Sequence, residues 1–437
     1  MSSTNIHVHH VTRIEGHADI DVILSDGRIE KVLWSVTESP RLFEVMLRGR
    51  DYGDVAHVAS RICGICSIAH SLASIRATEK AFGIEVSRQS EKLRSLLFHA
   101  EVLESHILHA YFLAAPDFLG VDSAVSLASS DEDALRRAMR LKRLAYVLAE
   151  ELAGRKTHPI SCVVGGFAKL PDPRRLEAVL TALRDSLADL ERTVDLFASL
   201  EMPDFARETE YIALTDPHEY AFLSNTVASS DTGSSPIEAF VEEIEEFCVP
   251  HSTAKYARHR RPSYMVGALS RFNLSHDRLR TRAKDAAERL GLVAPCHNPH
   301  ANTSAQVVEC MHAAEESISI LEELLGAPLS SPRVEVVPRA GRGIGVVEAP
   351  RGLLIHDYTY EASGAIASAN CIIPTNQNHG NIQADMEALL PSLVDPSEDE
   401  IRHRLEVLVR AYDPCVSCST HALRVRVGRT EARGARP

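Results

Sequence analysis

Apolar and polar residues alternate near the start of the chain, in the stretch HADIDVILSDGRIEKVLWSV that surrounds Asp26 and Gly27. A period of two is typical of strands that bury one face, and Asp-Gly is a favoured two-residue turn between paired strands. The first part of the sequence therefore predicts a β-hairpin.

The pattern then changes to the period of an amphipathic helix. Apolar residues recur at spacings of three and four from about Ser87 to Ala115, and Pro116 is expected to end this helix. The same period predicts helices over 131–154, 173–200, about 276–291, 302–325 and 397–410. Turn residues dominate 201–236 and 327–381, which predicts irregular chain with short strands. No βαβ alternation and no phosphate-binding glycine motif is evident. We therefore expect a mainly α-helical core with small β parts, of the α+β class.

Composition and charge narrow the function classes. The chain has 437 residues, of which 45% are hydrophobic and 24% are charged, as in an ordinary globular protein. Its formal net charge of −13 argues against nucleic acid or an anionic membrane as the main partner, because both require a basic surface. No apolar run approaches the roughly 20 residues that span a membrane, and the N-terminus lacks the features of a signal peptide. A cytoplasmic location is expected.

Four of the nine cysteines form two C-x-x-C pairs near opposite ends of the chain, Cys63 with Cys66 and Cys415 with Cys418. Four thiolates from two such loops are typical of tetrahedral sulfur coordination of a metal. A zinc ribbon usually has only about 15–20 residues between its pairs. The long separation here favours an active centre that is closed across a whole domain, with two redox dithiols or unrelated cysteines as alternatives.

The other metal-ligating residue types have plainer interpretations. His99, His106 and His109 share one face of a predicted helix, and we interpret them as packing groups or as groups behind the metal ligands. The cysteines without a partner pattern predict buried thiols. These are Cys162, Cys248, Cys296 and Cys310.

The flanks of the two pairs resemble the signature of nickel–iron hydrogenase large subunits. The motif RxCGxCxxxH, from Arg61 to His70, and the motif DPCxxCxxH, from Asp413 to His421, match its first and last parts. Further segments that resemble this family are RIEGH at 13–17, RLFE at 41–44, APRG at 349–352 and CIIPTNQN at 371–378. The resemblance covers about residues 7–424. It implies one large catalytic domain at 1–421, within which the turn-rich stretch at about 201–236 is expected to be an irregular insertion.

A nickel–iron centre is the first implication of the resemblance. Cys63 and Cys415 would be terminal ligands of nickel, and Cys66 and Cys418 would bridge nickel and iron. Carbon monoxide and two cyanides would complete the iron ligands, and maturation enzymes would supply them.

A magnesium ion and its surroundings are the second implication. The family binds this ion at positions that match the Glu44 carboxylate, the Cys371 backbone carbonyl and the His421 side chain. Behind the nickel–iron ligands the resemblance places His70, as a donor to a bridging sulfur, and Arg61.

Roles in catalysis are the third implication. Cys415 would accept the proton released from dihydrogen, and Glu15 would pass it outward. Arg351 would lie over the open metal positions, because its planar guanidinium offers a geometry that lysine lacks. Asp413 would hold Arg351 in place, although a purely structural salt bridge is the alternative for this pair.

Departures from the family pattern indicate a subgroup. Ser105 stands where membrane-bound members carry an aspartate, PTNQN replaces PTTWN, and VPHSTAKYA at 249–257 resembles the soluble, NAD(P)-linked, bidirectional members.

The implied enzyme interconverts H₂ with two protons and two electrons. A complex I-type subunit shares the fold but lacks the cysteine pairs, and a zinc-stapled scaffold is the remaining alternative.

The absence of further cysteine clusters from the sequence predicts partner subunits for electron transfer. The chain has no additional cysteine clusters for iron–sulfur centres, so electrons would leave through an iron–sulfur small subunit, and from there through a flavin- and NAD(P)-binding diaphorase. Residues 422–437 would be an extension that a maturation endopeptidase removes by cutting after His421.

Overall fold

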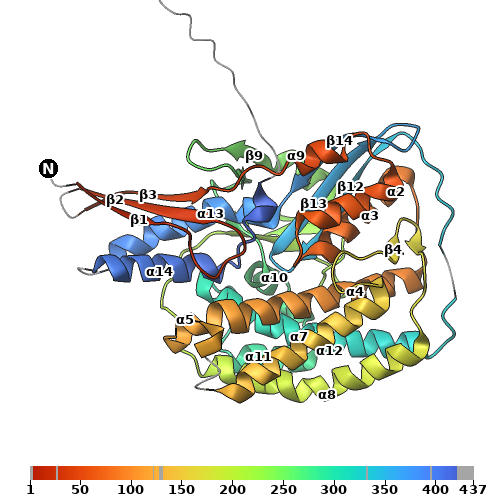
Figure 1. The fold of residues 1–437 in the computed structure, drawn as a ribbon, viewed down its shortest axis with the longest axis horizontal. Helices are drawn as coiled ribbons and strands as arrows, with labels where there is room; N and C mark the ends of the chain where they lie inside the picture. The colour runs from red at the N-terminus through yellow and green to blue at the C-terminus, as the bar shows by residue number, and fades with distance from the viewer. Residues whose placement is uncertain are drawn as a thin grey trace, which may run out of the picture.

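The structure is a computed structural model that describes residues 3–25, 28–121, 123–126, 131–330, 333–393 and 396–420. The predicted turn at Asp26 and Gly27, the magnesium ligand expected at His421, and the extension at 422–437 lie outside these residues. Within them, long helices form the lower half of the molecule, and the larger sheets lie above these helices (Figure 1).

The N-terminal sheet confirms the predicted hairpin and adds a third strand. Strands β1 (Ser3–Val8), β2 (Ala18–Ser25) and β3 (Arg28–Val36) are antiparallel and lie in the order β1-β2-β3. Alternate side chains such as Ile20 and Trp34 are fully buried, as a half-buried sheet requires. The sheet extends from the left of the molecule, beside α13 (Pro374–Leu389) and α14 (Glu398–Ala411) (Figure 1).

Four long helices form a layer: α4 (Arg88–Ile107), α7 (Glu132–Ala153), α8 (Pro173–Ala198) and α12 (Asn302–Leu325). Helix α12 packs against α4 and α8, and α7 packs against the same two helices (Figure 1). The apolar stripes of these four helices face one another. The spacing of apolar residues along the sequence therefore predicted the helices. All four helices were predicted. The bounds of α7, α8 and α12 agree to within about two residues, whereas the helix expected to reach Ala115 ends as an α-helix at Ile107.

The prediction that Pro116 ends the helix that begins near Ser87 is wrong. Helix α4 continues as a π-helical segment, η2 (Leu108–Ala114), and then as α5 (Ala115–Leu119). Pro116 occupies the first turn of α5. A proline is tolerated there because the first backbone N–H groups of a helix have no partner in that helix.

A second antiparallel sheet carries helix α3 (Ser67–Phe82) across one face. Its strands are β12 (Gly341–Ala349), β13 (Gly352–Tyr360) and β14 (Ile366–Ile372). A Cβ atom at Gly343 would lie 2.1 Å from the Ala77 carbonyl oxygen, and one at Gly345 would lie 2.0 Å from the Ala73 oxygen. Only glycine allows the helix backbone to approach the sheet so closely. This contact fixes α3, whose first turn follows Cys66.

Smaller elements complete the description. The predicted insertion at 201–236 contains β6 (Glu210–Leu214), β7 (Thr226–Ser229) and β8 (Gly233–Pro236), and β11 (Tyr264–Met265) extends their sheet. The helix expected at 276–291 is shorter, with a 3₁₀ turn η3 (His276–Arg278) before α11 (Thr281–Arg289). The other elements are α1 (Phe43–Leu47), α2 (Tyr52–Ala59), η1 (Ser60–Ile62), β4 (Cys162–Val163), β5 (Gly166–Phe167), α9 (Ile237–Glu243), β9 (Glu245–Cys248), β10 (Lys255–Arg258), α10 (Ala268–Ser275), η4 (Pro299–Ala301), η5 (Leu390–Ser392) and η6 (Ser417–Ser419). No helix among the described residues is long and apolar enough to cross a membrane.

Candidate metal centre

The two cysteine pairs meet in the interior of the molecule. The sulfur atoms of Cys63 and Cys415 lie 3.5 Å apart, and those of Cys66 and Cys418 lie 3.9 Å apart. All four sulfurs lie within 4.8 Å of one another, and all four residues are buried free cysteines. The fold thus brings together the four residues that the sequence pairs predicted.

Backbone and side-chain groups hold the first cysteine loop in place. The N–H groups of Ile65 and Cys66 donate to Cys63 Sγ at 3.3 and 3.4 Å. At the start of α3, the N–H groups of Ile68 and Ala69 donate to the buried Glu101 carboxylate at 2.6 and 2.9 Å. Because these N–H groups have no acceptor within α3, Glu101 from α4 serves as their cap.

The electrostatics of the four thiols indicate a cation site. Hydrogen bonds from Cys415 and the other thiols lower the pKa of Cys63, whereas burial raises the pKa of Cys415 and of Cys418 well above the ordinary value. Four sulfurs this close repel one another once they are ionised, so all four become thiolates together only around positive charge. Soft sulfur donors of this kind fit nickel and iron.

Glu15 lies against the second cysteine loop. Its Oε2 atom is 3.1 Å from Cys415 Sγ and accepts a hydrogen bond from Ser417 N at 3.1 Å. Its backbone carbonyl accepts from Val416 N at 2.9 Å. The carboxylate is partly buried and lies within one hydrogen bond of a thiol.

Arg351 and Asp413 form a buried pair beside the sulfurs. Arg351 Nε donates to the Asp413 carbonyl oxygen at 2.8 Å and to its Oδ1 atom at 3.1 Å. Nη2 lies 3.0 Å from the same Oδ1, yet neither Nη1 nor Nη2 makes a hydrogen bond within the described ranges. The guanidinium borders a small cavity together with Cys66, Cys415 and Cys418. Buried donors without acceptors at a cavity are suited to an anionic ligand of a bound group.

Further buried groups, which the sequence analysis did not identify, position this pair. Gln306 Nε2 donates to Asp413 Oδ2 at 3.0 Å, and Gln306 Oε1 lies 2.5 Å from His109 Nδ1. Arg271 forms buried ion pairs with Glu309 and Glu348 and donates to the carbonyls of Ala349 and Pro350, just before Arg351. The one sequence feature that could have predicted these contacts is the presence of polar or charged residues within apolar helical stretches.

His106 belongs to the same buried network. Its Nε2 atom lies 2.7 Å from Glu309 Oε2. His106 and His109 are therefore buried groups of the network behind Arg351 and Asp413, and neither makes a hydrogen bond to a cysteine among the described residues.

His70 and Arg61 occupy different environments. His70 lines the cavity beside the sulfurs, and its Nδ1 atom lies 3.1 Å from His356 Nε2. Burial lowers the pKa of His70 to about 4, so its imidazole is neutral at pH 7. The Arg61 side chain is exposed at the surface near α2.

Oxygen atoms gather where the magnesium ion is expected. Glu44 Oε1 accepts from Cys371 N at 3.0 Å, which brings these two expected ligand residues together. Lys255 Nζ lies 2.9 Å from Glu44 Oε1, 3.3 Å from Glu246 Oε2 and 3.0 Å from Asn370 Oδ1. The sequence analysis missed the lysine and the two added oxygens, although Lys255 lies in the VPHSTAKYA segment.

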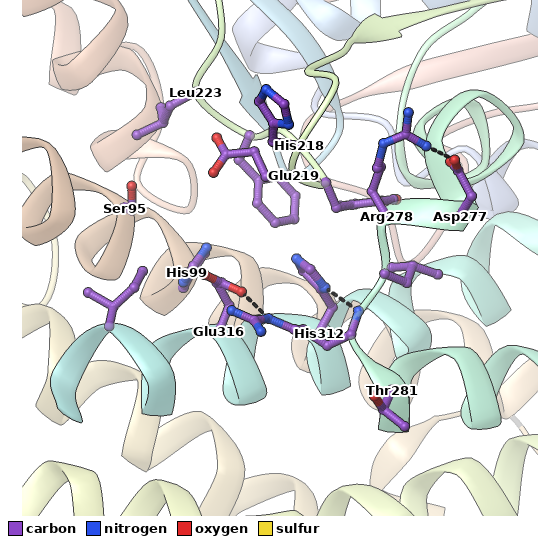
Figure 2. Close-up of a pocket in the computed structure, with 15 residues that line it drawn as sticks. Ser95, His99, His218, Glu219, Leu223, Asp277, Arg278, Thr281, His312 and Glu316 are labelled. Atoms are coloured by element: carbon purple, nitrogen blue, oxygen red, sulfur yellow. Dashed lines mark hydrogen bonds and ion pairs between the residues drawn. The ribbon is translucent and has the colours of Figure 1, made fainter. Parts of the chain in front are cut away.

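A more open cavity lies away from the sulfurs, between the neighbouring helices α4 and α12 on one side and the chain around 218–223 and 277–281 on the other (Figure 2). His99 from α4 and His312 and Glu316 from α12 lie on one side, and His218 and Glu219 lie opposite. His99 Nδ1 contacts Ser317 Oγ at 3.2 Å, and burial lowers the pKa of His99 to about 3 and that of His312 to about 4. These are neutral packing histidines, as expected for His99.

The prediction for the unpaired cysteines is correct for Cys162 and Cys310, which are buried. It is wrong for Cys248, which is exposed, and for Cys296, which is partly exposed. Cys248 ends β9, a strand whose only partner among the described residues is β10, so its side chain is left at the surface.

Comparisons with known proteins agree with this geometry. The family described as nickel-dependent hydrogenase matches residues 41–143 and 242–421, and a HoxL-like family matches residues 5–39. The chain is 32% identical to the alpha subunit of sulfhydrogenase 1 of Pyrococcus furiosus, over 96% of this chain and 98% of that protein. It is 31% identical to an F420-non-reducing hydrogenase subunit of Methanothermobacter thermautotrophicus, over 94% of each chain.

Solved structures give the same result. An NAD⁺-reducing [NiFe]-hydrogenase in the H₂-reduced state aligns with a TM-score of 0.85 and 27% identity, over 96% of this chain and 99% of that one. The Ni-Fe-Se hydrogenase of Desulfomicrobium baculatum shares the fold, with a TM-score of 0.76 at 22% identity over 96% of this chain and all of that one. The extent of the family match, the curated relatives and the four-cysteine centre together show that this chain belongs to the nickel-dependent hydrogenase family, as a large, catalytic subunit.

Proposed function

We propose that this subunit interconverts H₂ with protons and electrons at a nickel–iron centre, and that its electrons leave through an iron–sulfur small subunit toward NAD(P) or a similar carrier. The observation that carries the proposal is the cluster of four buried thiols within 4.8 Å of one another. Glu15 and Arg351 are positioned beside this cluster.

The four thiolates would hold the centre in two kinds of position. Cys63 and Cys415 are proposed as terminal ligands of nickel, and Cys66 and Cys418 as ligands shared between nickel and iron. When bound, such a centre supplies the two-electron redox chemistry of H₂ cleavage. The Nη1 and Nη2 atoms of Arg351, which make no hydrogen bond among the described residues, suit the anionic cyanides expected on the iron beside carbon monoxide. Asp413 fixes the plane of that guanidinium from the other side.

Proton movement is proposed to run through Cys415 and Glu15. The Cys415 sulfur accepts the proton from the substrate and transfers it to Glu15 Oε2, which is 3.1 Å away. Ser417 contacts Glu15 through its N–H and contacts Glu38 Oε1 through its hydroxyl, at 3.3 Å. Glu38 Oε1 lies 3.1 Å from Nδ1 of the exposed His17, so this series of groups leads to the surface.

A magnesium ion is proposed between the sulfur centre and the β9–β10 hairpin. Its ligands would be Glu44, the Cys371 carbonyl and His421. Glu246 and Asn370 bring additional oxygens to the same place, where the Lys255 ammonium pairs with the Glu44 and Glu246 carboxylates. A hard cation with oxygen donors fits these residue types.

The small subunit is proposed to dock over α1, next to the first cysteine loop. Val45 and Met46 on this short helix are 57% and 43% exposed, which is unusual for large apolar side chains on a protein surface. Met46 lines the same surface depression as Arg61, which lies two residues before Cys63. An electron-transfer partner at this place would approach the metal centre closely.

The electron carrier and the maturation step are proposed from the family resemblance. The NAD⁺-reducing hydrogenase with a TM-score of 0.85 supports a flavin- and NAD(P)-binding diaphorase as the next partner. The segment at 422–437 is proposed to be removed after His421 by a maturation endopeptidase. The predicted cytoplasmic location fits both proposals.

Metal analysis and infrared spectroscopy of the mature enzyme test the proposed centre. We expect one nickel and one iron per chain, together with cyanide and carbonyl bands in a spectral window where proteins do not absorb. The change Cys418→Ser should abolish both bands, whereas Cys310→Ser, at a buried cysteine outside the cluster, should leave them unchanged. Zinc alone in the wild-type protein, or the absence of the bands from mature protein, would refute the proposal.

A further inference from the structure

A histidine–carboxylate cluster lies on the outer face of the N-terminal sheet, and the proposed function does not use it. We propose that His7, His9 and Asp19 form a binding site for a divalent first-row transition-metal ion such as Zn²⁺ or Ni²⁺. This site is separate from the four cysteines and has a different donor set.

Strand alternation explains how the cluster forms. In the antiparallel β1–β2 pair, His7 is the partner of Asp21, and Val8 is the partner of Ile20. Val8 and Ile20 are buried on one face, so the next positions along each strand lie on the opposite face of the sheet. His9 lies two residues after His7, and Asp19 lies two residues before Asp21. Both therefore lie on the same face of the sheet as His7 and Asp21. The segments HVH and DID therefore display two imidazoles opposite two carboxylates on one face.

The donor atoms already converge. One donor atom from each of His7, His9 and Asp19 lies within 4.8 Å of the other two. Tetrahedral ligands at ordinary zinc distances lie about 3.3 Å apart, so the donors need to approach by at most about 1.5 Å. His9 Nδ1 is already 3.4 Å from Asp19 Oδ1. The histidine side chains are 50% and 63% exposed and can rotate, whereas that of Asp19 is 10% exposed and fixed.

Neighbouring hydrogen-bonding groups orient the donor side chains, as such groups do around metal ligands. Asp21 Oδ1 lies 2.5 Å from His7 Nδ1, which leaves His7 Nε2 to face the ion. Carboxylates commonly orient metal-bound imidazoles in this way. His10 N donates to Asp19 Oδ1 at 2.9 Å, and the His10 imidazole, 3.7 Å from the same oxygen, is available as a fourth ligand.

The chemistry of the donors selects the class of ion. Imidazole nitrogen with one carboxylate oxygen suits borderline ions such as Zn²⁺, Ni²⁺ and Cu²⁺, rather than Mg²⁺ or Ca²⁺. A bound ion would join β1 to β2 at the two ends of the segment that carries Glu15. We therefore expect the ion to slow amide hydrogen exchange in β1 and β2.

Zinc titration of the mature, metal-loaded complex tests the site. After gel filtration, elemental analysis should find one additional Zn²⁺ per large subunit, and X-ray absorption should show nitrogen and oxygen neighbours at about 2.0–2.1 Å rather than sulfur at about 2.3 Å. The double change His7→Ala with His9→Ala should remove this ion. The change Asp21→Asn should weaken its binding by about 10- to 100-fold, because His7 loses its orienting carboxylate.

The control is His218→Ala, which removes an exposed histidine at the surface cavity of Figure 2, away from the cluster. It should bind zinc as the wild type does. The proposal is overturned if the mature wild-type complex takes up no additional zinc, if the double variant binds as much as the wild type, or if the added zinc has sulfur neighbours. Since the test does not depend on turnover, it can succeed even if the proposed electron carrier is wrong.

Discussion

The sulfur of Cys415 lies 3.1 Å from Oε2 of Glu15, a residue from the opposite end of the chain. The contact depends on backbone pairing, because Glu15 and Cys415 form an isolated parallel bridge and Val416 N donates to the Glu15 carbonyl. The N-terminal loop is thereby joined to the second cysteine loop. A proton on the sulfur can reach the carboxylate without any movement of the backbone.

Replacing this carboxylate should block proton transfer while leaving the metal site intact. We expect Glu15→Gln to lower the rate of H₂ oxidation by about 100- to 10,000-fold, the range that a lost general base usually costs. Nickel and iron contents should stay at the wild-type level, because the amide oxygen can still accept from Ser417 N. A dye-reduction assay combined with elemental analysis measures both.

Glu406→Gln is the matched control for that change. Glu406 also reaches the N-terminal loop, where it accepts from the Thr12 hydroxyl at 3.5 Å, and it has no contact with the sulfurs. Its rate should remain within about twofold of the wild type. If Glu15→Gln were equally active, Glu15 would not be the first carboxylate on the proton route.

The geometry of Arg351 predicts that a charge-conserving change is not tolerated. Lysine keeps the positive charge, but its single ammonium nitrogen cannot contact Asp413 and also place two separate nitrogen donors at the cavity. We expect Arg351→Lys to lower kcat on the order of 100-fold, the typical cost of one oriented donor at a reacting centre. Arg342→Lys alters an exposed arginine–aspartate pair and should leave kcat unchanged, and similar rates for the two variants would contradict the role of Arg351.

Periodic apolar patterns predicted the helices well, and the paired cysteines predicted the centre. The helix expected at 302–325 has those bounds in the structure, because its apolar stripe faces α4 and α8. Helix α13 was not predicted, since buried polar residues from Asn376 to His379 conceal the apolar period. Helix α3 was also missed, because it is buried almost all round.

The residues that support the site were not recognised in the sequence either, because their charge suggested exposure to solvent. Glu101 and Arg271 are charged residues in helical stretches, which a pattern assigns to the solvent side. Both are buried, because each satisfies groups next to a functional loop: α3 N–H groups for Glu101 and the carbonyls before Arg351 for Arg271. Identifying them required the distances between elements that are remote in sequence.

Glu101 predicts a stability effect at the first cysteine loop. Glu101→Ala would leave the N–H groups of Ile68 and Ala69 without their acceptor, at a cost of about 1–3 kcal/mol for each buried donor left unsatisfied. We expect a lower melting temperature in a thermal denaturation experiment and a reduced nickel content. Glu91→Ala, at a partly exposed position on the same helix, should change neither by a comparable amount. An unchanged melting temperature for Glu101→Ala would show that water replaces this cap.

His379 predicts an acid-sensitive step in unfolding. Its buried Nδ1 atom accepts from Trp34 Nε1 at 2.8 Å, and burial lowers the pKa of His379 from 6.5 to about 3. Between these values the unfolded chain binds a proton that the folded chain does not, so the free energy of unfolding falls as the pH drops below about 6.5. From pH 7.5 to 5.5 this residue should account for a loss of about 1 kcal/mol.

Trp34 is the only tryptophan in the sequence, so its fluorescence during urea unfolding of the purified chain reports on this contact. His379→Gln retains a hydrogen-bond acceptor but cannot titrate, and it should reduce the loss between pH 7.5 and 5.5 by about 1 kcal/mol. His57→Gln, at an exposed position, should leave the pH dependence unchanged. If the free energy of unfolding had the same pH dependence in the wild type and in His379→Gln, the imidazole would also be protonated in the folded state. The hydrogen bond from Trp34 would then not keep His379 neutral.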